Sequence, residues 1–183
     1  MIVLKKNKYA LVLVLSIFVI SLVVGFIYGI NNPYDISEYV KNIDKNMLLF
    51  NHLLIVMLFF FSTISLIGIL INGFYIGFEG VSVGFVVSAF FKTYGIKGII
   101  YSLINLVLNK GLFIIILFYL FIVGIKYVKK CLSNIVGLST DYLIVLIKPM
   151  VKKYLLIVIF IVVYDLLNYF LLYKLVKYFT FIL

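Results

Sequence analysis

The sequence predicts an all-α fold: a polytopic membrane helix bundle with about five transmembrane helices and one short interfacial or re-entrant helix. Of the 183 residues, 66% are hydrophobic and only 12% are charged, and the mean hydropathy is +1.30. Apolar runs of about 20 residues recur, each long enough to cross a hydrocarbon layer of about 30 Å. A soluble domain of this length does not need so much apolar surface to fill one core. We therefore expect a single integral membrane domain over residues 1–183.

The first predicted span covers residues 9–30 and follows a short basic head. It is too long for a secretory signal and no small-residue cleavage site follows it, so we expect it to stay attached. Gly25 and Gly29 form a small-residue pair near its end. A slightly acidic polar loop, 31–46, should come next.

The second predicted span is 47–71, and Asn72-Gly73 predicts a tight reversal into a third span, 74–91. Small residues lie three or four positions apart around this third span. At roughly 100° per residue they share an arc of about 80° on one helix face. In lipid such a stripe lets a second helix approach backbone to backbone. That helix belongs either to this chain or to a second membrane protein. The stripe consists of Gly73, Gly77, Gly80, Gly84 and Ser88.

The apolar run after a short turn at Gly95 is 99–125, which as one helix would measure about 40 Å and exceed a simple crossing. Asn105, Asn109 and Lys110 interrupt it. A lysine near the bilayer centre costs about 2.5–3.5 kcal/mol. The sequence therefore predicts a break, with an interfacial or re-entrant helix over 96–108 and a compact fourth span over 111–125.

Residues 126–153 carry six lysines and one acid, Asp141. We expect this basic segment to lie on an anionic membrane surface. The fifth predicted span, 154–173, follows it. Lysines are enriched in the N-terminal head and in the basic segment, which indicates that the N-terminus of this multi-pass chain is cytoplasmic.

Glu79, Lys110 and Asp165 are the charges that lie well within apolar runs. One interpretation is an ion or proton relay, because ionisable groups inside membranes often mark a pathway. The other is structural: Lys110 and Asp165 fall at similar depth and could pair, with Asn168 one turn further along. His52, at the start of a span, is interpreted as an interfacial anchor and not as a metal ligand.

No nucleophile–base pair, zinc-protease motif or phosphate-binding loop is visible in the sequence. Cys131 is the only cysteine, so it forms no internal disulfide and no CxxC motif. The sixteen basic residues are all lysines, which argues against nucleic-acid binding despite the net charge of +10. We expect a protein that is not an enzyme and that holds no cofactor or metal.

At the glycine stripe the chain resembles the stage II sporulation protein M family. That family has a glycine-rich span of the form F-x-G-x-x-x-G-F, followed by a G-x-x-G turn and an amphipathic piece that ends at a polar break. The family often has a proline or histidine at the break, where this chain has Asn109 and Lys110, so a divergent member is indicated. The corresponding motif residues here are Phe78, Gly80, Gly84 and Phe85, then Gly95 and Gly98.

The resemblance implies a non-enzymatic scaffold that works during engulfment of the forespore. Its partners would be the lipid bilayer and the membrane-anchored peptidoglycan-degrading stage II sporulation proteins D and P, at the septal or engulfing membrane. The alternative function is a small ion- or proton-coupled transporter or permease component that uses Glu79, Lys110 and Asp165.

Overall fold

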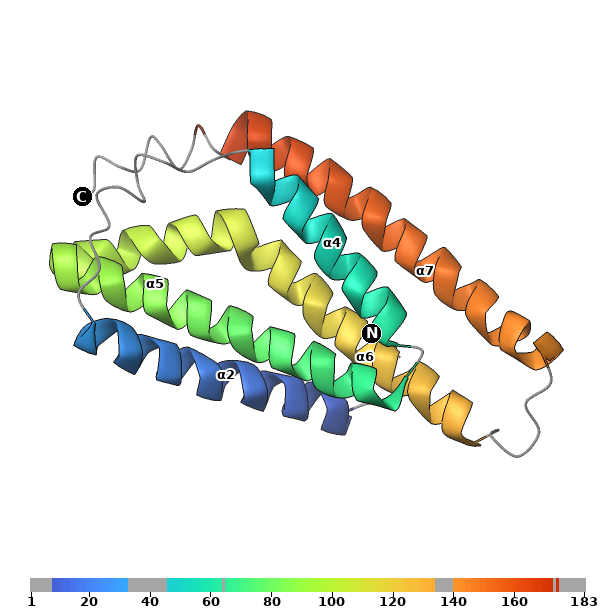
Figure 1. Ribbon diagram of the computed structural model, residues 1–183. Coiled ribbons are helices and arrows are strands. Elements are labelled where there is room, and N and C mark those ends of the chain that lie inside the picture. Colours follow the sequence, from blue (N-terminus) through green and yellow to red (C-terminus); the bar gives the residue numbers. More distant parts are fainter. Residues whose placement is uncertain (1–7, 33–45, 64, 134–139, 173, 175–183) are drawn as a thin grey trace.

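The computed structural model (Figure 1) describes residues 8–32, 46–63, 65–133, 140–172 and 174. The described part is helical apart from short turns, which confirms the predicted all-α class. The predicted basic head, most of the loop 31–46 and residues 134–139 of the basic segment lie outside the described residues. The elements are α2 (Lys8–Asn31), α4 (Asn46–Ser62), α5 (Leu66–Leu106), the π-helix η1 (Val107–Gly111), α6 (Leu112–Ser133), α7 (Thr140–Leu167) and the π-helix η3 (Asn168–Leu172).

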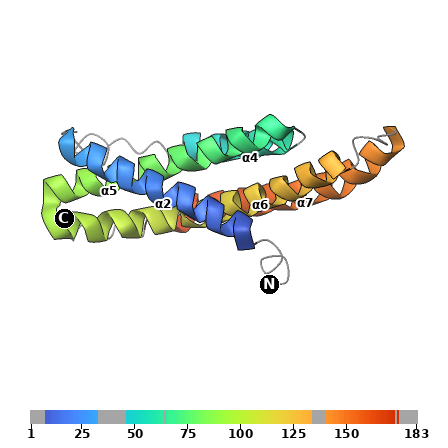
Figure 2. The same ribbon diagram turned by 90° about the horizontal axis from the view of Figure 1, so that it is seen from below.

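Helix α5 consists of two arms that fold back on each other at Gly95, as Figure 2 shows. Gly95 has φ 63° and ψ −142°, a conformation that costs glycine little and strains other residues. Beyond it the second arm packs against the first, with the rings of Phe90 and Tyr101 5.3 Å apart. A methyl group at Gly98 would overlap the carbonyl oxygen of Phe90. The predicted turn at Gly95 is confirmed, and Gly98 allows the two arms to touch.

Helix α2 and the first arm of α5 run parallel in contact along their lengths (Figure 1). Near one end, Gly77 lies against Ser21, and further along Gly84 lies against Leu22 and Phe26. Gly25 of α2 in turn faces the backbone of Val81. Small residues on both helices therefore interlock, which is the arrangement that allows close backbone approach.

Helix α4 returns antiparallel to the first arm of α5, and the reversal between them lies at 62–65. The predicted reversal at Asn72-Gly73 is wrong, because both residues lie inside α5. Hydroxyl groups explain the earlier turn: Ser62 and Thr63 donate back to the carbonyls three residues before them, which competes with helix hydrogen bonds. Ser65 then caps α5 by accepting from the amide of Gly68 at 3.1 Å.

Residues 96–133 form one helical path from the Gly95 hairpin through η1 into α6. The predicted break at Asn109-Lys110, with a separate helix over 96–108, is wrong. The chain passes this polar point with a π-helical turn, which widens the helix and keeps it continuous. Lys110 is accommodated there because it pairs with Glu79.

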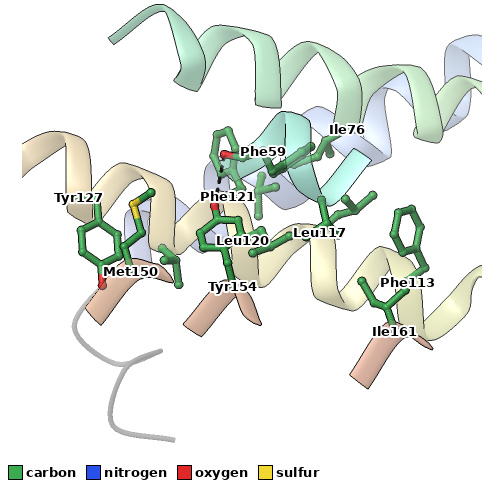
Figure 3. Packing of buried hydrophobic residues seen from close by; sticks show 13 residues of the cluster. Phe59, Ile76, Phe113, Leu117, Leu120, Phe121, Tyr127, Met150, Tyr154 and Ile161 are labelled. Atoms are coloured by element: carbon green, nitrogen blue, oxygen red, sulfur yellow. Dashed lines mark hydrogen bonds between the residues drawn. The ribbon is translucent and has the colours of Figure 1, made fainter. Parts of the chain in front are cut away.

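The main hydrophobic core lies where α4, α6 and α7 meet α5 and α2 (Figure 3). Phe113, Leu117, Leu120 and Phe121 of α6 line its middle. Antiparallel packing of α4 and α7 closes it, and the hydroxyl of Tyr154 donates to the carbonyl of Phe59 at 3.3 Å. A smaller cluster of Ala89, Phe90 and Tyr101 fills the hairpin end.

The close approach of α2 and α5 predicts that Gly84→Ala destabilises the fold. The new methyl would overlap the carbonyl oxygen of Leu22 and lie 2.8 Å from the amide nitrogen of Phe26. We expect a loss of about 1–3 kcal/mol, as for other overpacked cores, although alanine favours helix by about 1 kcal/mol. Thermal unfolding of the detergent-solubilised protein measures it.

Gly73→Ala on the same face is the matched control. Its methyl would meet nothing closer than 3.6 Å, so it should leave the melting temperature unchanged or raise it. Equal melting temperatures for the two variants would contradict the packing account.

Candidate functional site

Two side-chain pairs, each containing a carboxylate, lie inside the helix bundle. Glu79 of α5 and Lys110 of η1 are 3.1 Å apart, and the hydroxyl of Tyr75 donates to the other carboxylate oxygen of Glu79 at 2.8 Å. The Glu79 side chain is buried, whereas that of Lys110 is 31% exposed. This pair therefore joins the first arm of α5 to the π-helical turn that faces it across the hairpin.

His52 of α4 and Asp165 of α7 form the second pair and are more deeply buried. Nδ1 of His52 lies 2.9 Å and 3.1 Å from the two carboxylate oxygens of Asp165, and the side chains are 5% and 3% exposed. Phe113 of α6 stacks on the imidazole with the ring centroids 3.9 Å apart. Next to a carboxylate, Nδ1 carries the proton and donates. Three helices thus enclose one polar contact in apolar surroundings.

The two π-helices lie against each other next to these pairs. A π-helix leaves backbone carbonyls without their usual intrahelical partners, and side chains of α7 and η3 use two of them. The hydroxyl of Tyr164 donates to the carbonyl of Leu108 at 2.7 Å, and the Asn168 amide donates to the carbonyl of Asn109 at 3.5 Å. Asn109 also donates to the side-chain oxygen of Asn105. We call these polar contacts, together with the Glu79–Lys110 and His52–Asp165 pairs, the polar seam.

The structure changes the pairing expected from the sequence. The predicted pair of Lys110 and Asp165 is wrong, because Lys110 binds Glu79 and Asp165 binds His52. Lys110 and Asp165 do lie at a similar height along the bundle, as predicted. Tyr164, adjacent to Asp165, donates a hydrogen bond to the carbonyl of Leu108, two residues from Lys110. Depth along a helix follows from counting residues, but the direction in which each side chain points around its axis depends on neighbours.

His52 is the residue that sequence reasoning placed wrongly, as an interfacial anchor. It is buried and belongs to the polar seam. A signal was present, because a histidine in one apolar run and an aspartate in another are complementary groups that burial brings together.

The small-residue stripe is covered by this chain's own α2. Gly77, Gly80, Gly84 and Ser88 lie close against it. Gly73 lies in looser van der Waals contact with Ile17 of α2 and with Phe121 of α6. The sequence left two partners open for the stripe, a helix of this chain or a helix of a second membrane protein. The structure shows the first, since α2 lies against the stripe. The signal for this was the pair Gly25 and Gly29, spaced to match the stripe.

The buried polar groups of the seam are satisfied by one another and by backbone groups within the described part of the chain. Every buried side-chain nitrogen or oxygen there has a hydrogen-bond partner. The same residues contain no group of three or more His, Cys, Asp or Glu side chains that could hold a metal ion. The arrangement ties helices together, because all of its contacts except that between Asn105 and Asn109 join residues that are more than 30 positions apart in the sequence.

Two helical stretches of the described chain are long and apolar enough to cross a membrane, Lys8–Asn31 and Ile67–Lys130. The second contains the Gly95 hairpin, so its two arms run in opposite directions. A shorter apolar helix spans Asn51–Ser62. No protein family, curated protein or solved structure matches this chain.

The burial of His52 and Asp165 predicts strong coupling between them. His52→Leu alone would leave a carboxylate buried without its partner and should cost about 3–5 kcal/mol of unfolding free energy. The double variant His52→Leu/Asp165→Leu replaces the pair with apolar side chains and should recover more than half of that loss. Denaturant unfolding of wild type, both single variants and the double variant measures the coupling.

The Glu79–Lys110 pair supplies a comparison, because Lys110 reaches solvent. Lys110→Met should cost less than His52→Leu. Losses at His52 and Asp165 that simply add would contradict a mutually dependent pair.

Proposed function

We propose that the protein is an integral membrane protein that crosses the bilayer five times. The observation that carries the proposal is the distribution of side chains: the described bundle turns its acidic side chains inward and large apolar groups outward. Glu79 and Asp165 are buried, whereas large apolar side chains are exposed along the outer faces of the helices. On α2 alone these include Val12, Leu13, Val19, Ile20, Val23, Val24 and Ile27. A soluble protein rarely exposes contiguous apolar surface of this extent.

The helix directions support a five-crossing layout. Helix α2, the first arm of α5 and α7 would be the first, third and fifth crossings, with α4 and residues 96–133 as the second and fourth. The N-terminus and the α6–α7 connection would then lie on the cytoplasmic side, where the lysines of the basic segment belong. The loop 33–45 and the Gly95 hairpin would lie on the opposite side.

This layout predicts the labelling of introduced cysteines in intact cells. With Cys131 replaced by serine, Ser37→Cys should react with a membrane-impermeant maleimide from outside. Ser139→Cys should react only after the membrane is opened. Labelling of both positions from the same side would contradict five crossings.

We further propose that the protein is a non-enzymatic scaffold at the bacterial cell membrane. Its polar seam uses the buried charges to join helices, and its small-residue stripe is occupied by α2. Partner helices would therefore meet the outer apolar faces. The partner class comes from the resemblance to the stage II sporulation protein M family. It consists of the membrane-anchored peptidoglycan-degrading proteins D and P of forespore engulfment, at the septal or engulfing membrane.

The scaffold proposal predicts co-purification. Tagged full-length protein, solubilised from sporulating cells in mild detergent, should retain stage II sporulation proteins D and P. Gly84→Leu should lose them, because it separates α2 from α5 and disturbs the outer faces, while Gly73→Ala should keep them. Immunoblots of the purified fractions measure retention.

The competing candidate is a proton-coupled transporter, favoured by one observation, the enclosed His52–Asp165 contact. Reconstituted vesicles distinguish the two. A pH-dependent flux that disappears in Asp165→Asn would contradict the scaffold. The scaffold would also be contradicted if the wild-type protein inserts into the membrane but co-purifies with neither stage II sporulation protein D nor P.

A further inference from the structure

Lys110 lies near the middle of the fourth crossing of the proposed layout. Along the helical path, Lys97 lies about 20 Å from it on one side and Lys126 about 24 Å on the other, at 1.5 Å per residue. Together these distances match a full bilayer thickness of about 40–45 Å. Its partner Glu79 lies about 20 Å from Lys92 along the first arm of α5. Both members of the pair therefore lie at half height in the membrane.

The ammonium group of Lys110 has more hydrogen-bond donors than the described chain uses. An ammonium group carries three N–H donors, and Glu79 accepts one of them at 3.1 Å. Among the described residues no second side-chain or backbone oxygen accepts from this group, and the Lys110 side chain is 31% exposed. Charged side chains inside a membrane usually face the bundle interior or water. Lys110 instead presents donors at a depth where lipid offers only hydrocarbon.

An outward-facing row of residues passes next to Lys110. Its members recur every three or four positions along the path 96–133, and all are exposed except Gly111, which is half-buried. A methyl group at Gly111 would have Val107 and Leu106 of its own path as its nearest neighbours, at 3.8–3.9 Å. No atom of another described helix comes closer to it than these. We call this set the outer row: Ile100, Leu103, Val107, Gly111, Ile115 and Tyr119.

The charge of the pair indicates which group would accept from Lys110. The opposite charges of Glu79 and Lys110 offset each other, so a further carboxylate would add an uncompensated negative charge inside the membrane, which is costly. A side-chain amide supplies an acceptor without charge. A hydroxyl group is less available, because it bonds back to its own helix, as Ser16 does to the carbonyl of Val12 at 2.9 Å. The spare donors therefore fit an asparagine or glutamine side chain best.

We propose that the outer row binds a transmembrane helix of a second membrane protein, and that an asparagine or glutamine near the middle of that helix accepts a hydrogen bond from Lys110. Gly111 leaves room for the backbone of this helix next to the ammonium group, and the apolar members of the row pack against its side chains. The inference deepens the proposed scaffold function and rests on its five-crossing layout. It assigns the contact with a partner to one helical path.

Binding of a model transmembrane peptide tests the proposal. The full-length protein, carrying a fluorescent donor, is placed in phosphatidylcholine vesicles with an acceptor-labelled helix of leucine and alanine that has one asparagine at its centre. A central asparagine is level with Lys110 in either orientation of the peptide. Energy transfer should show binding about fivefold to thirtyfold tighter than that of the matched peptide with a central leucine, as expected for one hydrogen bond between membrane helices.

Two variants separate the ammonium group from the space next to it. Lys110→Met/Glu79→Gln removes the donors without leaving a carboxylate unpaired, and Gly111→Leu keeps the pair but fills the space. Each should bring the affinities of the two peptides to within about twofold of each other. Ser16→Leu is the matched control, because it adds the same bulk at an exposed position of a different helix, α2, and it should keep the full preference. Melting temperatures verify that each variant is folded.

The proposal is overturned if the asparagine peptide has no advantage, if its advantage survives in Lys110→Met/Glu79→Gln, or if a peptide with a central aspartate binds more tightly. Energy transfer between two labelled copies of the chain that disappears in Gly111→Leu would identify a second copy as the occupant and would also overturn it. Retention of stage II sporulation proteins D and P without an asparagine preference contradicts only the docking surface, whereas the opposite result contradicts only those partners. A chain that carbonate extracts from the vesicles contradicts the five crossings and the docking surface together.

Discussion

The backbone-to-backbone contact of α2 with the first arm of α5 is the constraint on which the rest of the structure depends. The two helices are parallel, and a chain can place consecutive long helices in parallel only if a segment returns between them. Helix α4 is that segment, and its antiparallel course brings His52, Phe59 and Thr63 to the faces of α6 and α7. The parallel pair itself is possible because Gly80 and Gly84 leave room for the backbone of α2.

The second half of the chain is held by a different interaction. Helix α7 is joined to α4 and η1 by polar contacts as well as by apolar packing. In surroundings without water a polar contact has few competitors, and leaving one partner unpaired is costly. Apolar packing allows helices to slide past each other. The carboxylate of Asp165, by contrast, has both of its oxygens about 3 Å from Nδ1 of His52, and this contact defines one position of α7 against α4. The bundle therefore combines close packing on one side with a specific register on the other.

Much of the fold could be predicted from the sequence, and the errors in that prediction have physical causes. Helical class, the turn at Gly95 and the packing role of the stripe follow from composition and spacing, which are local properties. The α4–α5 reversal was misplaced by about ten residues because Asn72-Gly73 has the stronger turn signature. The hydroxyl groups of Ser62 and Ser65 act through hydrogen bonds that a pattern does not reveal. The partners of Lys110 and Asp165 were missed because rotation about a helix axis is decided by tertiary packing.

The π-helix η1 has a consequence for how one helical path serves two cores. A π-helical turn contains about one residue more than an α-helical turn, so residues beyond it are rotated by about 100° relative to an uninterrupted α-helix. Before η1, Tyr101 faces the hairpin cluster with Phe90. After it, Phe113 and Leu117 face the main core with α4 and α7. The wide turn therefore works as a phase shift, and a single helix presents its apolar side first to one neighbour and then to another without any break in the chain.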